Sequence, residues 1–511
     1  MTMTMNFPEN AQRSRQYDRA IGAVLASAAG DALGSQYEFG PALADDHPVE
    51  FGVGYFGHAR GEWTDDTSMA VPILQVLARG EALNDTETLG RIVAEWRDWS
   101  RTAPDVGVQT GSVLGALDRG ALGADETRGD CTEEHARSVS RSIHERTGKS
   151  AGNGSLMRTG PVALGYLDDG QEDALADAAG RLAQLTHWED DNLDACVLWC
   201  LAIRHAIRTG ELDIRAQLAW VPAERRDRWA AFIDEALAPD AHPRDFRTQN
   251  GWVVRAFQGA LAAIAGARAT EGRTEVVGTL ERAIRGGGDA DTVAAIAGSL
   301  AGAVWGATQV PLAWRRILHG WPGLSANELT NLAFLAARGG KPTGDGWPSA
   351  PLVPTGGFLH TAPRQHPHDD GVWLGSLSAL AELPAQFAAG LGAVVSLSRV
   401  GAEQVPAGVE SIRVWLIDEP GHNANLDSVL TDAVDTIAAL RREGKQVFVH
   451  CAEARSRTAA VAALYGIRRC GIGHDQAWAD VAAVLPHFAP ALFHREAVAH
   501  IAQTSSLILG K

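Results

Sequence analysis

The spacing of apolar residues changes once along the chain, and this change constrains the fold more than any other feature. Residues 18 to about 338 consist of Ala- and Leu-rich stretches with a period near 3.6, separated by Gly and polar clusters. Later, short β-branched runs such as "GAVVSLSRV" and "QVFVHC" alternate with helical stretches. We therefore predict an all-α domain at 18–338 and a small α/β domain with a parallel sheet at 351–508. A segment rich in Pro and Gly separates them, and it predicts a linker at 339–350.

Two of the predicted helices carry small residues at every fourth position. The first set is Gly22, Ala26, Gly30 and Gly34, and the second is Gly298, Gly302 and Gly306. On a helix, residues four apart lie on one face, so each set forms a stripe without bulky side chains. Such stripes let two backbones approach closely. The pattern predicts two central helices that are packed against each other.

The composition excludes several classes of function. The formal net charge is -17 and the arginines are scattered, so we expect no nucleic-acid partner. The five cysteines include no CxxC pair, which argues against both a disulfide framework and a thiolate zinc site. The N-terminus has no apolar signal core, and the run of mostly small and apolar residues at 292–307 is shorter than a membrane span. We expect a cytoplasmic protein that does not enter a membrane.

Paired carboxylates occur in two short motifs of the first domain. Positions 64–67 read "TDDT" and positions 286–292 read "GGGDADT". Carboxylate and hydroxyl oxygens are hard ligands that suit Mg²⁺, Mn²⁺ or Ca²⁺ and do not suit zinc. Either motif alone also fits an ordinary helix N-cap. Two such clusters in one domain, one of them after three glycines, favour a metal site.

These motifs belong to a longer series that resembles the ADP-ribosylglycohydrolase family of the dinitrogenase-reductase-activating type. The matching blocks are "GAVLASAAGDALGSQYEF", "GEWTDDTSMA", "PDVGVQT", "SAGNGSLMRTGPVALG", "LTHWEDD" and "GGGDADTVAAIAGSLAGAVWG", and they span about 18–335. The resemblance implies an all-α fold that holds two Mg²⁺ or Mn²⁺ ions and cleaves the glycosidic bond between ADP-ribose and an acceptor. The ligand positions that it implies are Thr64, Asp65, Asp66, Asp289, Asp291 and Thr292.

The family's chemistry also requires an acid or base and a nucleotide site. Two ions bind ribose hydroxyls and activate water, while a further carboxylate transfers a proton. Asp105 matches the presumed base of the arginine-specific branch, and Glu38 matches the catalytic position of the serine-specific branch. The block at 150–158 fits a diphosphate or ribose clamp with Arg158 adding charge, although Asn-Gly also favours a flexible turn. His187 matches a residue lining the nucleotide site, but a single histidine also suits a structural role. The predicted substrate-binding residues are Ser150, Gly152, Asn153, Gly154, Ser155, Met157, Arg158 and His187.

The second domain carries a Cys-x5-Arg motif between a predicted strand and a predicted helix. Backbone N–H groups at a helix N-terminus attract an anion, and Arg457 can bind two of its oxygens. The same field favours the thiolate of Cys451, which is the nucleophilic form. The alternative is a buried cysteine beside a surface arginine. With "GVWLGSLSAL" at 371–380, the stretch 350–508 resembles the protein tyrosine and dual-specificity phosphatases.

That resemblance implies a cysteine-dependent phosphatase in which Thr458 also contacts the substrate. Its general acid is Asp418 or Glu419, and we prefer Asp418. The family usually has Gly where this chain has Ala454, and a position that needs an unusual backbone angle disfavours Ala. We predict a hydrolase of ADP-ribosylated protein arginine or another ADP-ribosyl conjugate, protein or small molecule, with a second domain acting on a phosphorylated substrate. The alternative is an ADP-ribose-binding regulator whose phosphatase-like domain is an inactive anchor.

Overall fold

The computed structural model describes residues 7–121, 131–267, 273–383 and 390–509. The chain separates into two compact units. The first, which we call the helical unit, comprises Gln16–Val310 and Ile317–Lys341. The second, which we call the α/β unit, comprises Pro342–Lys511 together with Met1–Arg15 and Pro311–Arg316. Within the described residues, no helix is both long enough and apolar enough to cross a membrane.

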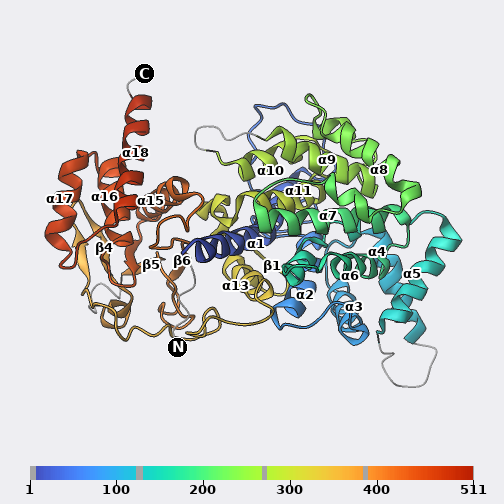
Figure 1. Cartoon of the computed structure of the whole chain (residues 1–511), viewed down its shortest axis with the longest axis horizontal. Helices are drawn as coiled ribbons and strands as arrows, with labels where there is room; N and C mark the ends of the chain where they lie inside the picture. The colour runs from blue at the N-terminus through green and yellow to red at the C-terminus, as the bar shows by residue number, and fades with distance from the viewer. Residues whose placement is uncertain (1–6, 122–130, 268–272, 384–389, 510–511) are drawn as a thin grey trace. The chain divides into compact units, whose positions relative to one another are not determined.

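The helical unit confirms the predicted all-α domain, and in its described residues one small hairpin departs from it. Strands β1 (His319–Gly320) and β2 (Leu324–Ser325) pair antiparallel. Every other long element is helical (Figure 1). The helices are α1 (Phe7–Gly34, from Gln16 on in this unit), α2 (Asp65–Ala78), α3 (Thr86–Ser100), α4 (Val108–Ala121), α5 (Glu133–Thr147), α6 (Glu172–Gln184), α7 (Asp190–Thr209), α8 (Ala223–Ala236), α9 (Val253–Gly266), α10 (Glu275–Arg285), α11 (Ala290–Trp305) and α13 (Ala326–Ala336).

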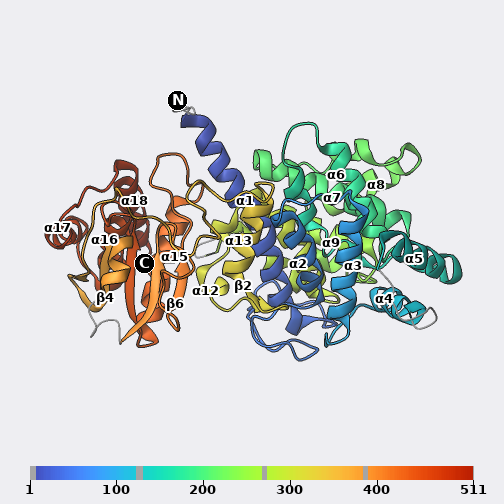
Figure 2. The same cartoon turned by 90° about the horizontal axis from the view of Figure 1, so that it is seen from below.

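Helix α11 is the central element of the helical unit. It packs on α7, α9 and α10, and its residues from Ala290 to Ala303 are all buried (Figure 1). Elsewhere in the unit α2 packs between α3 and α13, which lie on its two sides in Figure 2. Because α2 and α11 both begin with carboxylates, the packing of these helices decides where the carboxylates lie.

The two small-residue stripes meet, as predicted. A Cβ atom on Gly22 or Gly302 would lie closer than 3.0 Å to the backbone of the other helix, and one on Gly298 would meet the carbonyl oxygen of Ala26. At Gly34 the added atom would meet the backbone of Asp291. The stripes therefore hold α1 against α11 at backbone contact, and they fix the position of the first turn of α11.

Replacing Gly302 by alanine is expected to destabilise the helical unit by about 3 kcal/mol, because the new methyl group must push α1 and α11 apart. The midpoint of urea unfolding, followed by tryptophan fluorescence, measures the change. Gly111→Ala in α4 is the matched control, since its Cβ would find its nearest neighbour at 3.6 Å. Equal midpoints for the two variants would show that the close contact is absent.

The α/β unit has a five-stranded sheet with the order β3-β4-β7-β5-β6. Strands β4 (Asp369–Ser376), β7 (Gln446–Cys451), β5 (Leu391–Ser396) and β6 (Glu410–Arg413) are parallel, as predicted. Strand β3 (Arg364–His366) joins the edge antiparallel, so the sheet is mixed at that edge. This strand lies between Pro363 and Pro367, and the prolines of this part of the chain obscured the strand pattern in the sequence.

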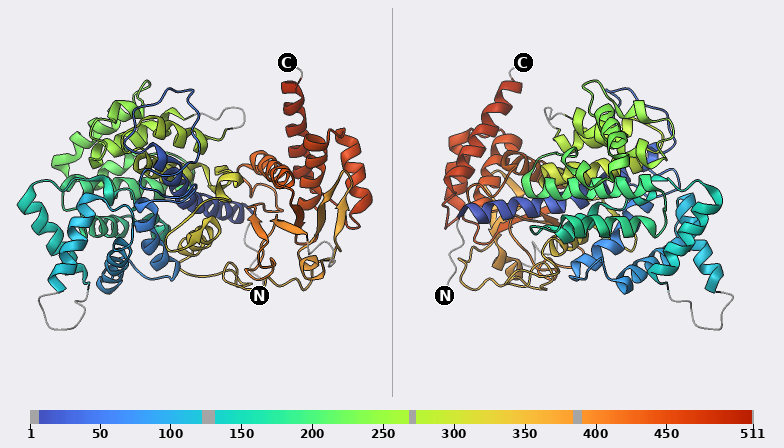
Figure 3. Two further views of the ribbon diagram at one scale, coloured as in Figure 1. Left: turned by 180° about the vertical axis from the view of Figure 1, so that it is seen from behind. Right: turned by 45° about the vertical axis from the view of Figure 1, so that its right-hand side comes forward.

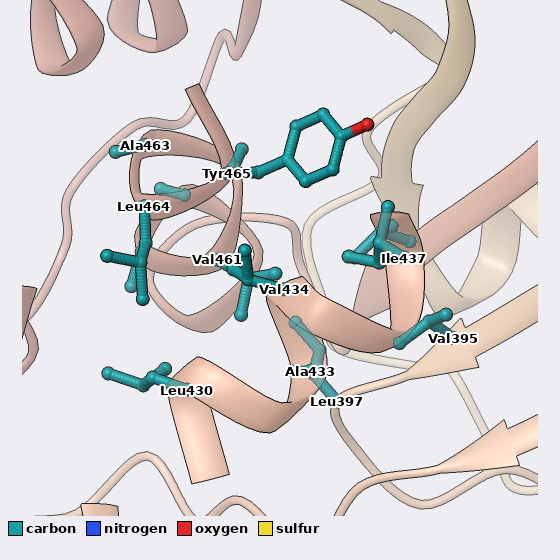
Figure 4. Packing of buried hydrophobic residues seen from close by; sticks show 14 of the residues in the cluster. Val395, Leu397, Leu430, Ala433, Val434, Ile437, Val461, Ala463, Leu464 and Tyr465 are labelled. Carbon is teal, nitrogen blue, oxygen red and sulfur yellow. The ribbon is translucent and has the colours of Figure 1, made fainter. Parts of the chain in front are cut away.

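Among the described residues, four long helices accompany this sheet, and their apolar faces form much of the core of the unit. They are α15 (Leu426–Arg442), α16 (Arg457–Cys470), α17 (His474–Val484) and α18 (Leu492–Leu509). The left view of Figure 3 shows them, orange to red, gathered beside the strands. In Figure 4, Leu430 and Val434 of α15 lie near Val461 and Leu464 of α16, with Val395 of β5 close by. This packing places the start of α16 directly after the end of β7.

Candidate active sites

Two carboxylate motifs that are more than 200 residues apart in the sequence meet in the helical unit. Asp65 and Asp66 lie in the first turn of α2, Asp289 lies at the N-cap of α11, and Asp291 lies in its first turn. Carboxylate oxygens of Asp31, Asp66 and Asp291 lie within 4.8 Å of one another. So do those of Glu38, Asp289 and Asp291. Asp291 belongs to both groups, which makes it the centre of one cluster, called here the carboxylate cluster.

The electrostatics of the carboxylate cluster fit a bound cation. Burial raises the pKa of Asp66 and of Asp291 well above the ordinary range, and repulsion from neighbouring carboxylates adds to the rise. One oxygen of each of these two residues has no hydrogen-bond partner in the described part of the chain. Buried carboxylates that lack partners are costly unless a positive charge compensates them. Their hard oxygen atoms match Mg²⁺ or Mn²⁺, and the predicted ligand Thr292 lies beside Asp66 at 3.5 Å between Oγ1 and Oδ2.

Asp31 is a member of the carboxylate cluster that the sequence prediction missed. Its Oδ1 accepts hydrogen bonds from the backbone N–H and hydroxyl of Thr64, at 2.9 and 2.8 Å. Its Oδ2 accepts two more from Thr67, at 2.9 and 2.6 Å. Asp31 thus caps α2 from another helix, because the side chain of Thr64 forms no cap hydrogen bond of its own. The signal available in the sequence was a single acid in the Ala- and Gly-rich stretch 20–34.

Of the two candidate acids, Glu38 is a member of the carboxylate cluster and Asp105 lies beside it, on a different loop. Burial raises the pKa of Glu38 to about 9, with Asp105 and Asp289 adding to the rise. Burial raises the pKa of Asp105 to about 6; His58 opposes the rise, and Asp289 adds to it. The backbone N–H of Gly107 donates to Oδ2 of Asp65 at 3.2 Å, which ties the Asp105 loop to the start of α2.

The predicted clamp at 150–158 also reaches the carboxylate cluster. The clamp contains the short helix η2 (Asn153–Ser155). Nδ2 of Asn153 donates a hydrogen bond to Oδ2 of Asp289 at 2.7 Å, which joins this helix to the cluster. Two asparagines that were not predicted hold the arrangement. Asn192 donates to the carbonyl oxygen of Gly152 at 2.6 Å. Asn250 accepts from the backbone N–H of Asp289 at 3.1 Å and donates to the carbonyl oxygen of Gly287 at 3.0 Å.

Three other predicted clamp residues contribute to packing in this structure. The hydroxyl of Ser150 lies 2.8 Å from Nδ1 of His144, and the hydroxyl of Ser155 accepts a hydrogen bond from Asn192 at 2.7 Å. The side chain of Met157 is buried. Arg158 differs from the prediction that it adds charge to a diphosphate. Its guanidinium lies 4.1 Å from the ring centroid of Trp96 and donates to Thr186 and to the carbonyl oxygen of Leu182. The side chain is buried in the interior, where a planar cation stacks on an aromatic ring.

The Cys-x5-Arg motif of the α/β unit connects the end of β7 to the first residue of α16. Cys451 is buried, and Nη1 of Arg457 donates to the carbonyl oxygens of Leu397 at 2.8 Å and Leu416 at 3.1 Å. Behind the cysteine, Nε2 of His450 lies 2.8 Å from Oγ of Ser396, and burial lowers the pKa of this histidine to about 4. The hydroxyl of Thr458 is buried without a hydrogen-bond partner among the described residues.

Asp418 and Glu419, the two candidates for the general acid, have different contacts. Oδ1 of Asp418 accepts a hydrogen bond from Ser456 at 2.7 Å, and its Oδ2 lies 3.6 Å from Nε of Arg457. The side chain of Glu419 is half exposed and lies 3.1 Å from His422 instead. Only Asp418 of the two contacts the loop that follows Cys451. The position favours the predicted assignment of Asp418, whose role stays a prediction.

Comparison with known proteins agrees with both sites. The model of the family described as ADP-ribosylglycohydrolase matches residues 12–343. This chain belongs to the ADP-ribosylglycohydrolase family. The model of the dual specificity phosphatase catalytic domain matches residues 372–502. The helical unit is therefore an ADP-ribosylglycohydrolase domain, and the α/β unit is a domain of the dual specificity phosphatase type.

Individual relatives match the ADP-ribosylglycohydrolase domain. The ADP-ribosylarginine hydrolase Tri1 of Pseudomonas putida is 28% identical over 302 residues, which are 58% of this chain and 73% of the relative. The ADP-ribosyl-[dinitrogen reductase] glycohydrolase of Rhodospirillum rubrum is 27% identical over 318 residues, 58% of this chain and 89% of the relative. A solved ADP-ribosylglycohydrolase-related protein complex is 27% identical, covering 64% of this chain and 100% of that one, with a TM-score of 0.44.

A cavity of about 520 Å³ opens beside the carboxylate cluster of the ADP-ribosylglycohydrolase domain. The residues that line it include Thr64, Asp65 and Asp105. They also include the aromatic residues Trp99 and Trp321. The residues that line the cavity include Asp105 and do not include Glu38. The two candidate acids therefore face different surroundings.

The loop after Cys451 contains a strained residue. Ala454 has a φ of 57° and is fully buried, so the position does adopt the backbone angle that disfavours Ala. Ala454→Gly is expected to relieve about 1 kcal/mol and to tighten orthovanadate binding by about fivefold. Isothermal titration calorimetry measures the affinity. Ala452→Gly is the matched control, because Ala452 lies in the same loop and has no positive φ. This variant is expected to weaken binding slightly. Unchanged or weaker binding by Ala454→Gly would contradict the strain.

Proposed function

We propose that the helical unit is a divalent-metal-dependent hydrolase that releases ADP-ribose from an arginine side chain. The observation that carries the proposal is the carboxylate cluster, in which Asp291 connects two groups of acids at the starts of α2 and α11. In this proposal two Mg²⁺ or Mn²⁺ ions would be held by Thr64, Asp65, Asp66, Asp289, Asp291 and Thr292, with Asp31 positioning Thr64. When bound, the ions would supply positive charge that orients ribose hydroxyls and activates a water molecule.

The chain's own groups then account for the remaining steps. Asp105 lines the cavity, which supports its role as the carboxylate that exchanges a proton with the departing acceptor. Cleavage breaks the bond between the ribose carbon and the acceptor nitrogen; the water oxygen takes that place on carbon, and the nitrogen receives a proton. Glu38 lies within 4.8 Å of Asp289 and Asp291 and has a pKa raised to about 9, so at neutral pH its protonated carboxyl group is the one that can donate a hydrogen bond to the substrate.

The cavity supports arginine as the acceptor. A guanidinium is planar and cationic, stacks on aromatic rings and pairs with carboxylates. The cavity offers Trp99 and Trp321 for stacking and Glu62 and Asp105 for pairing. One relative of this chain bears the name ADP-ribosylarginine hydrolase, which agrees with this chemistry.

The test of this function is release of ADP-ribose by the full chain. ADP-ribosyl-arginine, ADP-ribosyl-serine and an acetyl-linked ADP-ribose are each incubated with Mg²⁺, with Mn²⁺ and with EDTA. We expect the arginine conjugate to be cleaved fastest, and EDTA to remove the activity. No release from any of the three would refute the hydrolase. Faster release from serine would refute the acceptor and leave the hydrolase intact.

We propose a second activity for the α/β unit, the hydrolysis of a phosphate monoester through Cys451. The sulfur bonds to phosphorus as the ester oxygen leaves, Asp418 gives that oxygen a proton, and water then hydrolyses the phosphocysteine. The contacts of Asp418 with Ser456 and Arg457 carry this proposal. Turnover of p-nitrophenyl phosphate tests it, and an absence of turnover would leave the inactive phosphate-binding anchor as the better description.

A further inference from the structure

Three buried polar side chains form a chain of hydrogen bonds behind the clamp in the helical unit. Nη2 of Arg158 donates to Oγ1 of Thr186 at 2.7 Å, and the same Oγ1 lies 2.7 Å from Nδ1 of His187. All three residues are at most 1% exposed. The carbonyl oxygen of Thr186 accepts from the side chain of Gln109 at 2.9 Å, so the backbone at this point is also held.

The direction of each proton in this chain follows from the chemistry of the donors. A guanidinium only donates, so the Thr186 hydroxyl must accept from Arg158. The hydroxyl has one proton of its own, and its other partner is Nδ1 of His187. If Nδ1 donated instead, to the second lone pair of the hydroxyl, the buried hydroxyl proton would have no acceptor among the described contacts of Thr186. The arrangement that satisfies both groups has Nδ1 accepting that proton and carrying none itself. A neutral imidazole in this state carries its hydrogen on Nε2.

The surroundings keep His187 neutral. Burial lowers its pKa well below the ordinary value, and the positive charge of Arg158 lowers it further. Burial also lowers the pKa of Arg158, to about 9, so the guanidinium stays charged at neutral pH. The ring of His187 is therefore an uncharged donor at Nε2 with an orientation fixed from Nδ1.

The Nε2 edge of His187 faces the clamp. A Cβ atom on Gly152 or on Gly154 would lie 3.3 Å from Nε2, so both residues leave this edge uncovered because they are glycines. Between them, Asn153 reaches Asp289 in the carboxylate cluster. Within the described residues, Nε2 has no protein acceptor among the hydrogen bonds of His187. A donor that points at a glycine turn on the border of the cluster is available to a ligand.

We propose that Arg158 and Thr186 are positioning residues, which hold His187 as the Nε2–H tautomer so that it donates to an oxygen of ADP-ribose bound over the 152–154 turn. The proposal rests on the proposed hydrolase function of the helical unit. It gives Arg158 an indirect part in ligand binding, through two side chains, although the guanidinium itself does not face the ligand. The oxygen that His187 meets carries a lone pair and most favourably a negative charge, as in the diphosphate.

The first test reads the tautomer without any ligand. Full-length protein labelled with ¹⁵N-histidine is studied by long-range ¹H–¹⁵N correlation NMR, and the His187→Gln variant identifies the signals of His187. We expect the hydrogen on Nε2 from pH 6 to pH 8. In Thr186→Val, which keeps the shape but removes the hydroxyl, a mixture of tautomers is expected. A hydrogen on Nδ1 in the unmodified protein would overturn the proposed positioning of His187 by Arg158 and Thr186, whatever the protein's activity.

The second test measures ADP-ribose binding with Mg²⁺ by calorimetry. Thr186→Val is expected to raise Kd about tenfold, because a charged hydrogen bond loses its fixed donor. The conservative variant Thr186→Ser, which restores the hydroxyl, is expected to restore both the tautomer and most of the affinity. If Thr186→Val keeps its affinity and the unmodified protein releases ADP-ribose normally, the positioning role of Arg158 and Thr186 is refuted. The proposed function would still stand. Failure of the unmodified protein to bind ADP-ribose would count against the proposed function, while the NMR result still decides the tautomer.

Discussion

Asp291→Asn is expected to lower the rate of ADP-ribose release about a thousandfold. The substitution keeps the size of the side chain and removes the one charge that belongs to both halves of the carboxylate cluster. With that charge absent, neither group of acids retains its full set of ligands for a divalent cation. Initial rates with ADP-ribosyl-arginine and saturating Mg²⁺ measure the loss.

A thermal unfolding experiment separates metal binding from a general loss of structure. We expect Mg²⁺ to raise the Tm of the unmodified protein, because the cation binds only the folded state, and we expect this rise to disappear in Asp291→Asn. The exposed Asp240→Asn is the matched control and should keep both the rate and the rise in Tm. An Asp291→Asn variant that keeps its activity and its response to Mg²⁺ would refute the two-ion site.

Cys451→Ser is expected to lower phosphatase turnover at least about a thousandfold, while the release of ADP-ribose stays unchanged. A serine hydroxyl at neutral pH is a far weaker nucleophile than a thiolate. Turnover of p-nitrophenyl phosphate measures the effect. Cys470→Ser at the end of α16, which changes the same atom outside the loop, should leave the turnover intact.

The acid can be tested in the same assay. Asp418→Asn is expected to slow turnover far more than Glu419→Gln, because only Asp418 contacts Ser456 and the Arg457 side chain. Turnover that survives Cys451→Ser would refute the nucleophile. A larger loss in Glu419→Gln would refute the assignment of the acid.

The sequence predicted those features that depend on short, contiguous motifs. The periodicity divided the chain into a helical part and an α/β part, and the small-residue stripes indicated that α1 and α11 pack together. The loop from Cys451 to Arg457 could be predicted because one strand end and one helix start contain all of it. The unusual backbone angle at Ala454 was anticipated in the same way, from the residue type expected there.

Features that depend on long-range packing were missed. Asp31 lies on α1 and acts through hydrogen bonds to α2. The sequence of α1 alone does not indicate which helix Asp31 contacts. The direction of the Arg158 side chain follows from its stacking on Trp96, which no spacing rule connects with residue 158. Asn192, in α7, and Asn250, in the turn before α9, hold the clamp and were missed for the same reason.

The contact between the glycines of α1 and α11 has a consequence for how the protein is made. Gly22 leaves the ribosome about 280 residues before Gly302. At about 5–20 residues per second, the face of α1 that α11 covers stays without its partner for tens of seconds during synthesis. The acids at 289 and 291 arrive together with that partner. A nascent chain that stalls before α11 therefore has neither a closed helical core nor a complete set of acids, and it is a natural substrate for chaperones until translation passes this helix.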